Sequence, residues 1–278
     1  MNKALAYLQL ARPLNVIIGA LSIFMGAFIA GSIEPLNKVI LAMISGALIA
    51  GAANSINDYF DVNIDSINKP YRPIPANKLT RREAYTYSLV LFVLGVLLSI
   101  FINQTAFIIA IFACLLLYTY SARLKRTVIW GNLTVSFMTA FAFIYGGVAV
   151  DLLTISLIPA IFAFLFHFGR EIIKDIEDMN GDQSDGARTL PLIYGVRISL
   201  LLMTFIYALL IVLTYMPYML NIFGNIYVYI VTCGVNVVLI FTIISSWRKP
   251  EPENLGRLSL LLKIDMFIGL IAIYFGRF

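Results

Sequence analysis

The chain has 278 residues, of which 60% are hydrophobic and only 13% are charged, and its mean hydropathy is +0.89. Soluble domains carry about 25% charged residues, so this composition excludes an ordinary soluble domain and indicates an integral membrane protein. The formal net charge of +5 is modest, and we expect no nucleic-acid partner.

The apolar segments predict the elements in chain order. A spanning helix needs about 20 mostly apolar residues, and a short surface helix over 2–11 is expected before the first one. Residues 1–12 contain charges and no cleavable apolar core, so no signal peptide is predicted. The predicted spans are 14–32, 36–57, 83–102, 104–121, 128–149, 152–173, 194–215, 225–246 and 258–276.

Backbone groups inside a bilayer must be hydrogen-bonded within the protein, which favours helices throughout. The sequence therefore predicts an all-α, polytopic membrane protein with about nine transmembrane helices in a bundle around a central cavity.

Lysine and arginine are concentrated in every second connection, which predicts that these connections face the cytoplasm. The basic segments are the N-terminal residues, 58–83, 122–127, 170–197 and 247–257. We expect a multi-pass protein of the cell membrane with its active site on the cytoplasmic side. The net charge then reflects topology and an attraction to anionic head groups.

Two of the basic connections contain the same acidic pattern, D-x-x-D-x-x-x-D. The motifs are Asp58-Tyr-Phe-Asp61-Val-Asn-Ile-Asp65 and Asp175-Ile-Glu-Asp178-Met-Asn-Gly-Asp182, and Arg72-Pro-Ile-Pro75 and Arg188-Thr-Leu-Pro191 follow them. The repetition predicts a single domain, 1–278, with two related halves at about 10–125 and 127–245 and a final helix.

Spacings of three and four place such side chains on one face of a helix. Like charges repel there, so two copies favour a bound cation over solvated loops. Oxygen ligands suit Mg²⁺, which binds through one or two carboxylates plus substrate phosphates. A calcium loop is excluded, because its required glycine is replaced by Ser66 in one copy and Gln183 in the other.

Several polar side chains near the motifs are candidates for binding the substrate, including its diphosphate. They are Arg12, Asn15, Asn54, Asp58, Lys69 and Arg72, then Tyr118, Tyr120, Lys125 and Arg126, then Arg170, Lys174, Asp175 and Arg188. Alternatively, some basic residues serve only topology, and the tyrosines belong to the aromatic belt. His167 is interpreted as a packing residue. Cys114 and Cys233 lie within predicted spans, which suggests neither a disulfide framework nor a zinc site.

Metal ions and basic groups at the mouth of an apolar helical cavity suit a substrate with a diphosphate head and a long hydrocarbon tail. Neutralising the departing diphosphate lets an allylic C–O bond ionise, and an acceptor traps the carbocation. Stabilisation of a leaving group is commonly the largest catalytic term. The expected partners are a polyprenyl diphosphate donor, a lipid or lipophilic acceptor and the bilayer.

At these residues the chain resembles the UbiA superfamily of intramembrane prenyltransferases. The likeness rests on Asn57-Asp58-Tyr-Phe-Asp61-Val-Asn-Ile-Asp65 with Asn68-Lys69-Pro70-Tyr-Arg72-Pro73, on the second motif with Thr189-Leu-Pro191, and on Arg12-Pro13 and Leu124-Lys125-Arg126. One departure is that Tyr120 precedes Lys125 by five residues, whereas the family pattern is Tyr-x-x-x-Lys.

The resemblance implies a nine-helix bundle, dependence on Mg²⁺ and transfer of a polyprenyl group. It implies metal ligands at Asn57, Asp61, Asp65, Asp178 and Asp182, with Arg72, Lys125 and Lys174 on the diphosphate. Lys125 and the metal ligands together form the expected catalytic set.

Within the superfamily, the chain is most similar to the geranylgeranylglycerol-phosphate geranylgeranyltransferases of archaeal ether-lipid synthesis. That branch implies transfer from geranylgeranyl diphosphate to the free hydroxyl of geranylgeranylglyceryl phosphate. Aromatic acceptors (4-hydroxybenzoate, quinone precursors or chlorophyllide types) are an alternative. An ion-coupled transporter is an alternative of another class, but transporter sites usually lie near the bilayer midplane.

Overall fold

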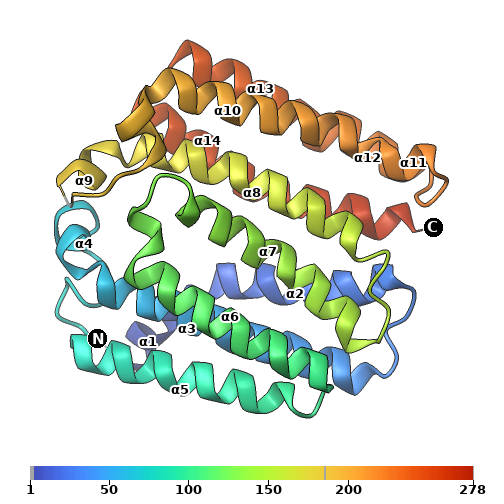
Figure 1. Cartoon of the computed structure of the whole chain (residues 1–278), viewed down its shortest axis with the longest axis horizontal. Helices are drawn as coiled ribbons and strands as arrows, with labels where there is room; N and C mark the ends of the chain where they lie inside the picture. Colours follow the sequence, from blue (N-terminus) through green and yellow to red (C-terminus); the bar gives the residue numbers. More distant parts are fainter. Residues whose placement is uncertain (1–2, 185, 278) are drawn as a thin grey trace. The chain divides into compact units, whose positions relative to one another are not determined.

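The computed structural model describes residues 3–184 and 186–277, and every regular element in these two stretches is a helix (Figure 1). The chain divides into two compact units, an N-terminal unit of 1–125 with 141–156 and a C-terminal unit of 126–140 with 157–278. The predicted all-α, multi-pass fold is confirmed. The predicted division into two related halves stays a prediction.

The N-terminal unit contains α1 (Lys3–Ala11), α2 (Pro13–Ala30), α3 (Leu36–Phe60), α4 (Val62–Asn68), α5 (Arg81–Ser99), α6 (Gln104–Ala122) and η1 (Leu124–Arg126) as far as Lys125. Helix α7 (Trp130–Ala149) contributes its residues from 141 onward to this unit and its earlier residues to the other. The C-terminal unit further contains α8 (Leu157–Glu177), α9 (Met179–Ser184), α10 (Leu190–Thr214), α11 (Met216–Met219), α12 (Asn225–Ile230), the π-helix η2 (Val231–Val235), α13 (Asn236–Arg248) and α14 (Pro252–Gly276).

Eight helical segments of the described chain are long and apolar enough to cross a membrane, and they match eight of the predicted spans. The remaining predicted span, 152–173, corresponds to α8, which has 21 residues. Helix α8 differs from the other eight by the charged side chains at its C-terminal end, among them Arg170, Glu171 and Lys174. Helix α14 begins at Pro252, six residues before the predicted start. The prediction began too late because the first turns of the helix carry polar side chains.

Helix α3 is the central helix of the N-terminal unit, where it packs against α1, α2, α5 and α6 (Figure 1). Buried hydroxyls hold α5 against it: Ser45 Oγ donates to the Gly95 carbonyl at 2.7 Å, and Ser88 Oγ donates to the Ala52 carbonyl at 3.0 Å. These bonds satisfy polar groups that lipid cannot solvate.

Helix α2 and the second half of α7 approach each other backbone to backbone. A Cβ on Gly26 would lie 2.1 Å from the carbonyl oxygen of Phe143, and a Cβ on Gly146 would lie 1.9 Å from that of Ile23. Small residues allow such close contact between membrane helices. Only glycine fits at these two positions.

We therefore expect Gly26→Ala to destabilise the protein by roughly 1–3 kcal/mol, since a rigid carbonyl blocks the new methyl group. Thermal unfolding in detergent measures the effect. The matched control is Gly19→Ala in the same helix, where a Cβ meets no described atom within 4 Å. Equal stability of the two variants would contradict the close packing of α2 and α7.

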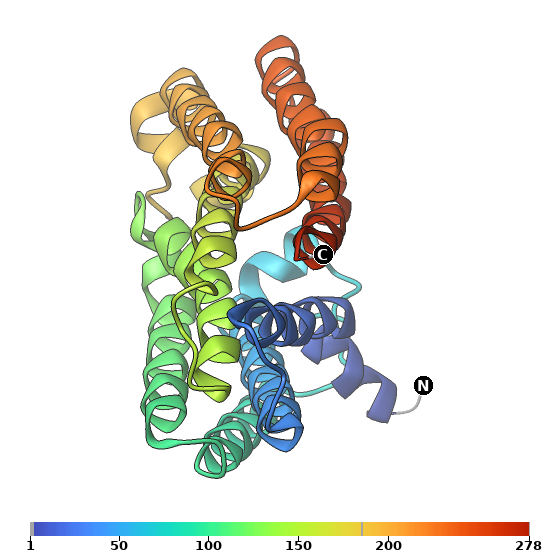
Figure 2. The ribbon, with the colours of Figure 1, turned by 90° about the vertical axis from the view of Figure 1, so that its right-hand side faces the viewer.

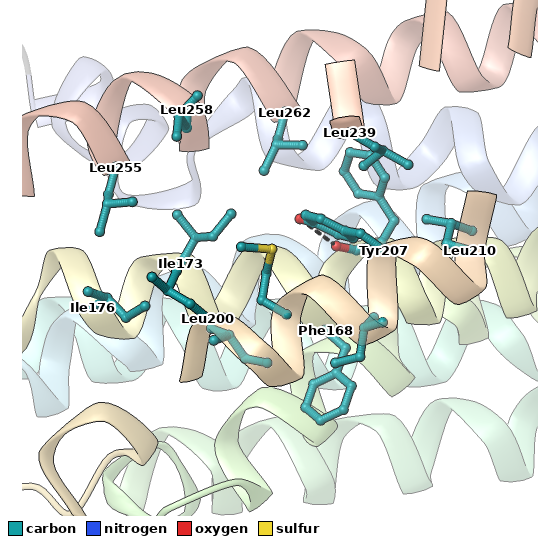
Figure 3. Close-up of a cluster of buried hydrophobic side chains, with 14 of the residues drawn as sticks. Phe168, Ile173, Ile176, Leu200, Tyr207, Leu210, Leu239, Leu255, Leu258 and Leu262 are labelled. Atoms are coloured by element: carbon teal, nitrogen blue, oxygen red, sulfur yellow. Dashed lines mark hydrogen bonds between the residues drawn. The ribbon is translucent and has the colours of Figure 1, made fainter. Parts of the chain in front are cut away.

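The core of the C-terminal unit is a cluster of large apolar side chains from α8, α10, α13 and α14 (Figure 3). Tyr207 is fully buried in it and lies against Gly169, whose missing side chain leaves room for the ring. Helices α12 and α13 pack along α14, and η2 joins them without ending the helix (Figure 2).

Short helices occupy the polar connections. Helix α1 agrees with the predicted surface helix over 2–11 from residue 3 onward, since residue 2 lies outside the described residues. It buries Ala6 and Leu10 against Ile74, Leu79 and Ala84. This small cluster fastens the connection between α4 and α5, which carries Arg72.

Candidate active site

The first acidic motif spans the junction between α3 and α4. The Asp61 N–H donates to the Asn57 carbonyl at 2.9 Å, and the Asp65 N–H donates to the Asp61 carbonyl at 2.8 Å. Helical hydrogen bonding therefore continues through the junction and keeps these three side chains on one face. Asn57 Nδ2 also donates to Asp61 Oδ2 at 2.8 Å.

Every carboxylate of this motif has a basic partner. Arg12 pairs with Asp58; Arg72 Nη1 lies 3.1 Å from Asp58 Oδ1 and 2.5 Å from Asp65 Oδ2. Lys125 pairs with Asp61, and its Nζ also lies 3.5 Å from Asn57 Oδ1. The side chains of Asp58 and Asp65 are only 4% and 6% exposed. Carboxylates this deep need such partners, because losing their hydration costs several kcal/mol per ion.

The junction between α1 and α2 brings Arg12 to the motif. Arg12 has φ 56° and ψ 74° in the left-handed region, which few residues other than glycine adopt. Asn54 Nδ2 donates to the carbonyl of Ala11 at 2.8 Å and so ties this bend to α3. Asn54 was predicted to contact substrate; in this structure its amide holds the backbone beside Arg12.

Burial raises the pKa of the Asp65 carboxyl above its ordinary value, while the charge and hydrogen bond of Arg72 act in the opposite direction. A nearby cation favours the ionised form of such a group. The positive charge beside Asp65 therefore favours its ionised form and opposes the effect of burial.

The remaining candidates of the N-terminal unit lie near the ends of helices. Asn15 is half-buried in the first turn of α2, and Lys69 caps the end of α4. The ring of Tyr118 packs edge-on against that of Phe60, near the end of α3, with the ring centroids 5.8 Å apart. Tyr120 is half-buried in the last turn of α6.

The second acidic motif runs from the end of α8 into α9. The Asp178 N–H donates to the Lys174 carbonyl at 2.8 Å, and the Asp182 N–H donates to the Asp178 carbonyl at 3.0 Å. Asp178 and Asp182 are therefore about one helical turn apart, and both are half-buried. This arrangement parallels that of Asp61 and Asp65 in the first motif.

Glu171 is the buried acid between the basic candidates of α8. Arg170 Nη1 lies 3.1 Å from Glu171 Oε1, and Lys174 Nζ lies 3.2 Å from Glu171 Oε2. Arg170 Nε also donates to the carbonyl of Ser259 on α14 at 3.4 Å. Its side chain is therefore held within the unit and does not simply extend toward the membrane interface.

Two further contacts join the second motif and the nearby Arg188 to residues just before α7 and in its first turn. Asn132 Nδ2 donates to Asp175 Oδ2 at 2.7 Å, and the Arg188 N–H donates to the Arg126 carbonyl at 2.9 Å. Asn132 was not among the sequence candidates. No local pattern singles it out, because it lies 43 residues before its partner.

The donor chemistry of both motifs fits Mg²⁺ bound together with a diphosphate. Their side chains offer carboxylate and amide oxygens, and Mg²⁺ typically takes one or two carboxylates plus water and phosphate oxygens. Within residues 3–184 and 186–277, no three His, Cys, Asp or Glu side chains come together as a metal-binding group.

Residues 19–271 match the family described as the UbiA prenyltransferase family. The chain belongs to this family. It is 34% identical, over 97% of its length and 95% of the relative's, to digeranylgeranylglyceryl phosphate synthase of Methanothermobacter thermautotrophicus. The predicted resemblance and the predicted enzyme class, prenyltransferase, are confirmed. Membership of a transferase family argues against the transporter alternative.

Solved structures show the same fold. One, described as a digeranylgeranylglyceryl phosphate synthase in membranes, is 36% identical, covers 100% of this chain and 99% of its own, and has a TM-score of 0.81. A UbiA homologue from Archaeoglobus fulgidus, bound to DMAPP and Mg²⁺, is 19% identical, covers 96% and 99% of the two chains, and has a TM-score of 0.73.

The buried ion pairs predict a large effect of Arg72→Ala on stability. Asp65 would lose its basic partner, and removing one member of a buried pair costs roughly 3–5 kcal/mol. Adding Asp65→Asn should recover much of that loss, because the uncompensated charge disappears. Chemical unfolding in detergent measures both variants.

Arg257→Ala is the control, since Arg257 and Glu253 form an exposed pair and such pairs contribute little. If Arg72→Ala were as mild as this control, the pairing of Arg72 with Asp65 would not be a stabilising contact.

Proposed function

We propose that the protein transfers a geranylgeranyl group from geranylgeranyl diphosphate to the free hydroxyl of geranylgeranylglyceryl phosphate, in the synthesis of ether lipids. Full-length similarity to digeranylgeranylglyceryl phosphate synthases carries this proposal, both in sequence and in solved structure. In the reaction the allylic C–O bond of the donor breaks, and its electron pair leaves with diphosphate. The acceptor oxygen then bonds to the allylic carbon and gives up its proton to diphosphate or to a motif carboxylate.

The proposed metal is Mg²⁺, with Asn57, Asp61 and Asp65 as ligands in one unit and Asp178 and Asp182 in the other. The bound metal would neutralise charge that develops on the departing diphosphate. Support comes from the oxygen donors of both motifs and from the Archaeoglobus fulgidus homologue, which holds DMAPP and Mg²⁺.

Arg72 and Lys125 are proposed to bind the diphosphate. Both already contact the carboxylates that would hold the metal, so a diphosphate bridged to that metal comes within their reach. Guanidinium groups bind phosphate oxygens in a fixed fork geometry, and lysine acts as a mobile point charge. Arg12 and Lys69 of the N-terminal unit are proposed to surround the same group. The basic candidates of the C-terminal unit are proposed to supply positive charge beside the second motif; they are Arg126, Arg170, Lys174 and Arg188.

The active side is proposed to be cytoplasmic. Both acidic motifs lie in connections rich in lysine and arginine, and such connections remain on the cytoplasmic side. Donor and acceptor would reach the protein from the bilayer, since both carry long hydrocarbon chains.

Asp61→Asn and Asp178→Asn should each lower prenyl transfer by roughly 100-fold or more, because electrostatic stabilisation of a leaving group is worth at least that much. The measurement is transfer from labelled geranylgeranyl diphosphate, with circular dichroism to verify helix content. The control is Asp151→Asn, which changes an exposed aspartate outside both motifs. Full activity of both motif variants would refute the assignment of these two carboxylates.

The acceptor is identified by incubating purified protein and Mg²⁺ with labelled geranylgeranyl diphosphate and a panel of acceptors. Geranylgeranylglyceryl phosphate should gain the label. Label on 4-hydroxybenzoate alone would replace this acceptor with an aromatic one. Mg²⁺-stimulated uptake into vesicles without any covalent product would instead favour transport.

A further inference from the structure

One short segment, Arg126–Asn132, contacts both ends of the connection that carries the second acidic motif. The carbonyl of Arg126 accepts the N–H of Arg188 at 2.9 Å, and the amide of Asn132 donates to Asp175 Oδ2 at 2.7 Å. Asp175 precedes Asp178 and Asp182, and Arg188 follows them. The same segment therefore holds the chain both before and after the two proposed metal ligands, Asp178 and Asp182.

This segment is anchored independently of the Asn132 amide. Val128, Ile129 and Leu133 pack against the apolar core of the C-terminal unit, and Met179 of α9 packs against the same core. The backbone carbonyl of Asn132 accepts the hydroxyl of Ser136, and the residue is 6% exposed. Losing the amide should therefore leave the segment in place.

The Asn132 contact differs in charge from the contacts of the first motif. There, Asp58, Asp61 and Asp65 are each paired with a basic side chain. Asp175 instead accepts a hydrogen bond from a neutral amide. Such a bond orients the Asp175 side chain and brings no positive charge to it.

We propose that Asn132 is a positioning residue whose amide orients Asp175 and thereby sets the position of Asp178 and Asp182 and their affinity for a divalent cation. The inference rests on the proposed function. It assigns Asn132 a role through Asp175 and no contact with substrate.

Asn132→Leu removes the donor at similar size, and Asn132→Asp removes it and places a second carboxylate beside Asp175. Both should weaken Mn²⁺ binding, measured by electron paramagnetic resonance, about tenfold, the factor that corresponds to one lost contact of 1.4 kcal/mol. Hydrogen exchange over residues 178–188 should accelerate. In the transfer assay, the Mg²⁺ concentration that gives the half-maximal rate should rise by a larger factor than the KM for the acceptor does.

Thr134→Val is the matched control, because its hydroxyl donates within α7, to the carbonyl of Trp130 at 2.7 Å. The double variant Asn132→Asp with Asp175→Asn restores the hydrogen bond with its direction reversed. We expect it to recover slow exchange over 178–188, which a generally damaged protein would not do.

Wild-type Mn²⁺ affinity and exchange in both single variants would overturn the positioning role, as would equal losses in Thr134→Val. Failure of the double variant to recover slow exchange would also overturn it. These outcomes are separate from the proposed function, which fails only if the unaltered protein forms no digeranylgeranylglyceryl phosphate.

Discussion

The structure depends on balancing charge in surroundings that cannot hydrate it. An ionised group inside or at the edge of the hydrocarbon layer is costly unless a partner compensates it. The chain has 15 acidic and 20 basic residues. Among the buried carboxylates of the described chain, Asp58, Asp65 and Glu171 meet arginine or lysine at close range, whereas the buried Asp265 has no hydrogen-bond partner among the described residues. The Arg12–Asp58 and Arg72–Asp65 pairs are the clearest cases.

This balance links the first acidic motif to elements that are distant in sequence. Helix α1 packs under the connection that carries Arg72, the bend after α1 presents Arg12, and the end of α6 leads to Lys125. All three basic groups converge on the junction between α3 and α4, where they meet Asp58, Asp61 and Asp65. The site proposed for an anionic substrate and its metal is thus assembled, within one unit, from positive and negative groups that neutralise each other.

The second motif is balanced in another way. Glu171 carries the ion pairs with Arg170 and Lys174, whereas Asp175 is held by the neutral amide of Asn132. The repeated sequence pattern therefore does not imply repeated electrostatics. Membership of the UbiA prenyltransferase family defines the class of reaction, and these local contacts decide how each carboxylate of this chain is held.

The sequence by itself determined the spans, the helical class and the two acidic faces, because each depends on local quantities: apolar length and spacings of three and four residues. It misplaced the start of α14, where polar residues occupy the first turns. Only the tertiary structure decided the partners of the site residues. Arg12 and Asp58 are 46 residues apart, and Asn132 and Asp175 are 43 apart. Contacts over such separations come from helix packing, which no local pattern records. The close approach at Gly26 and Gly146 has the same origin, because a glycine shows its necessity only when the neighbouring backbone is in place.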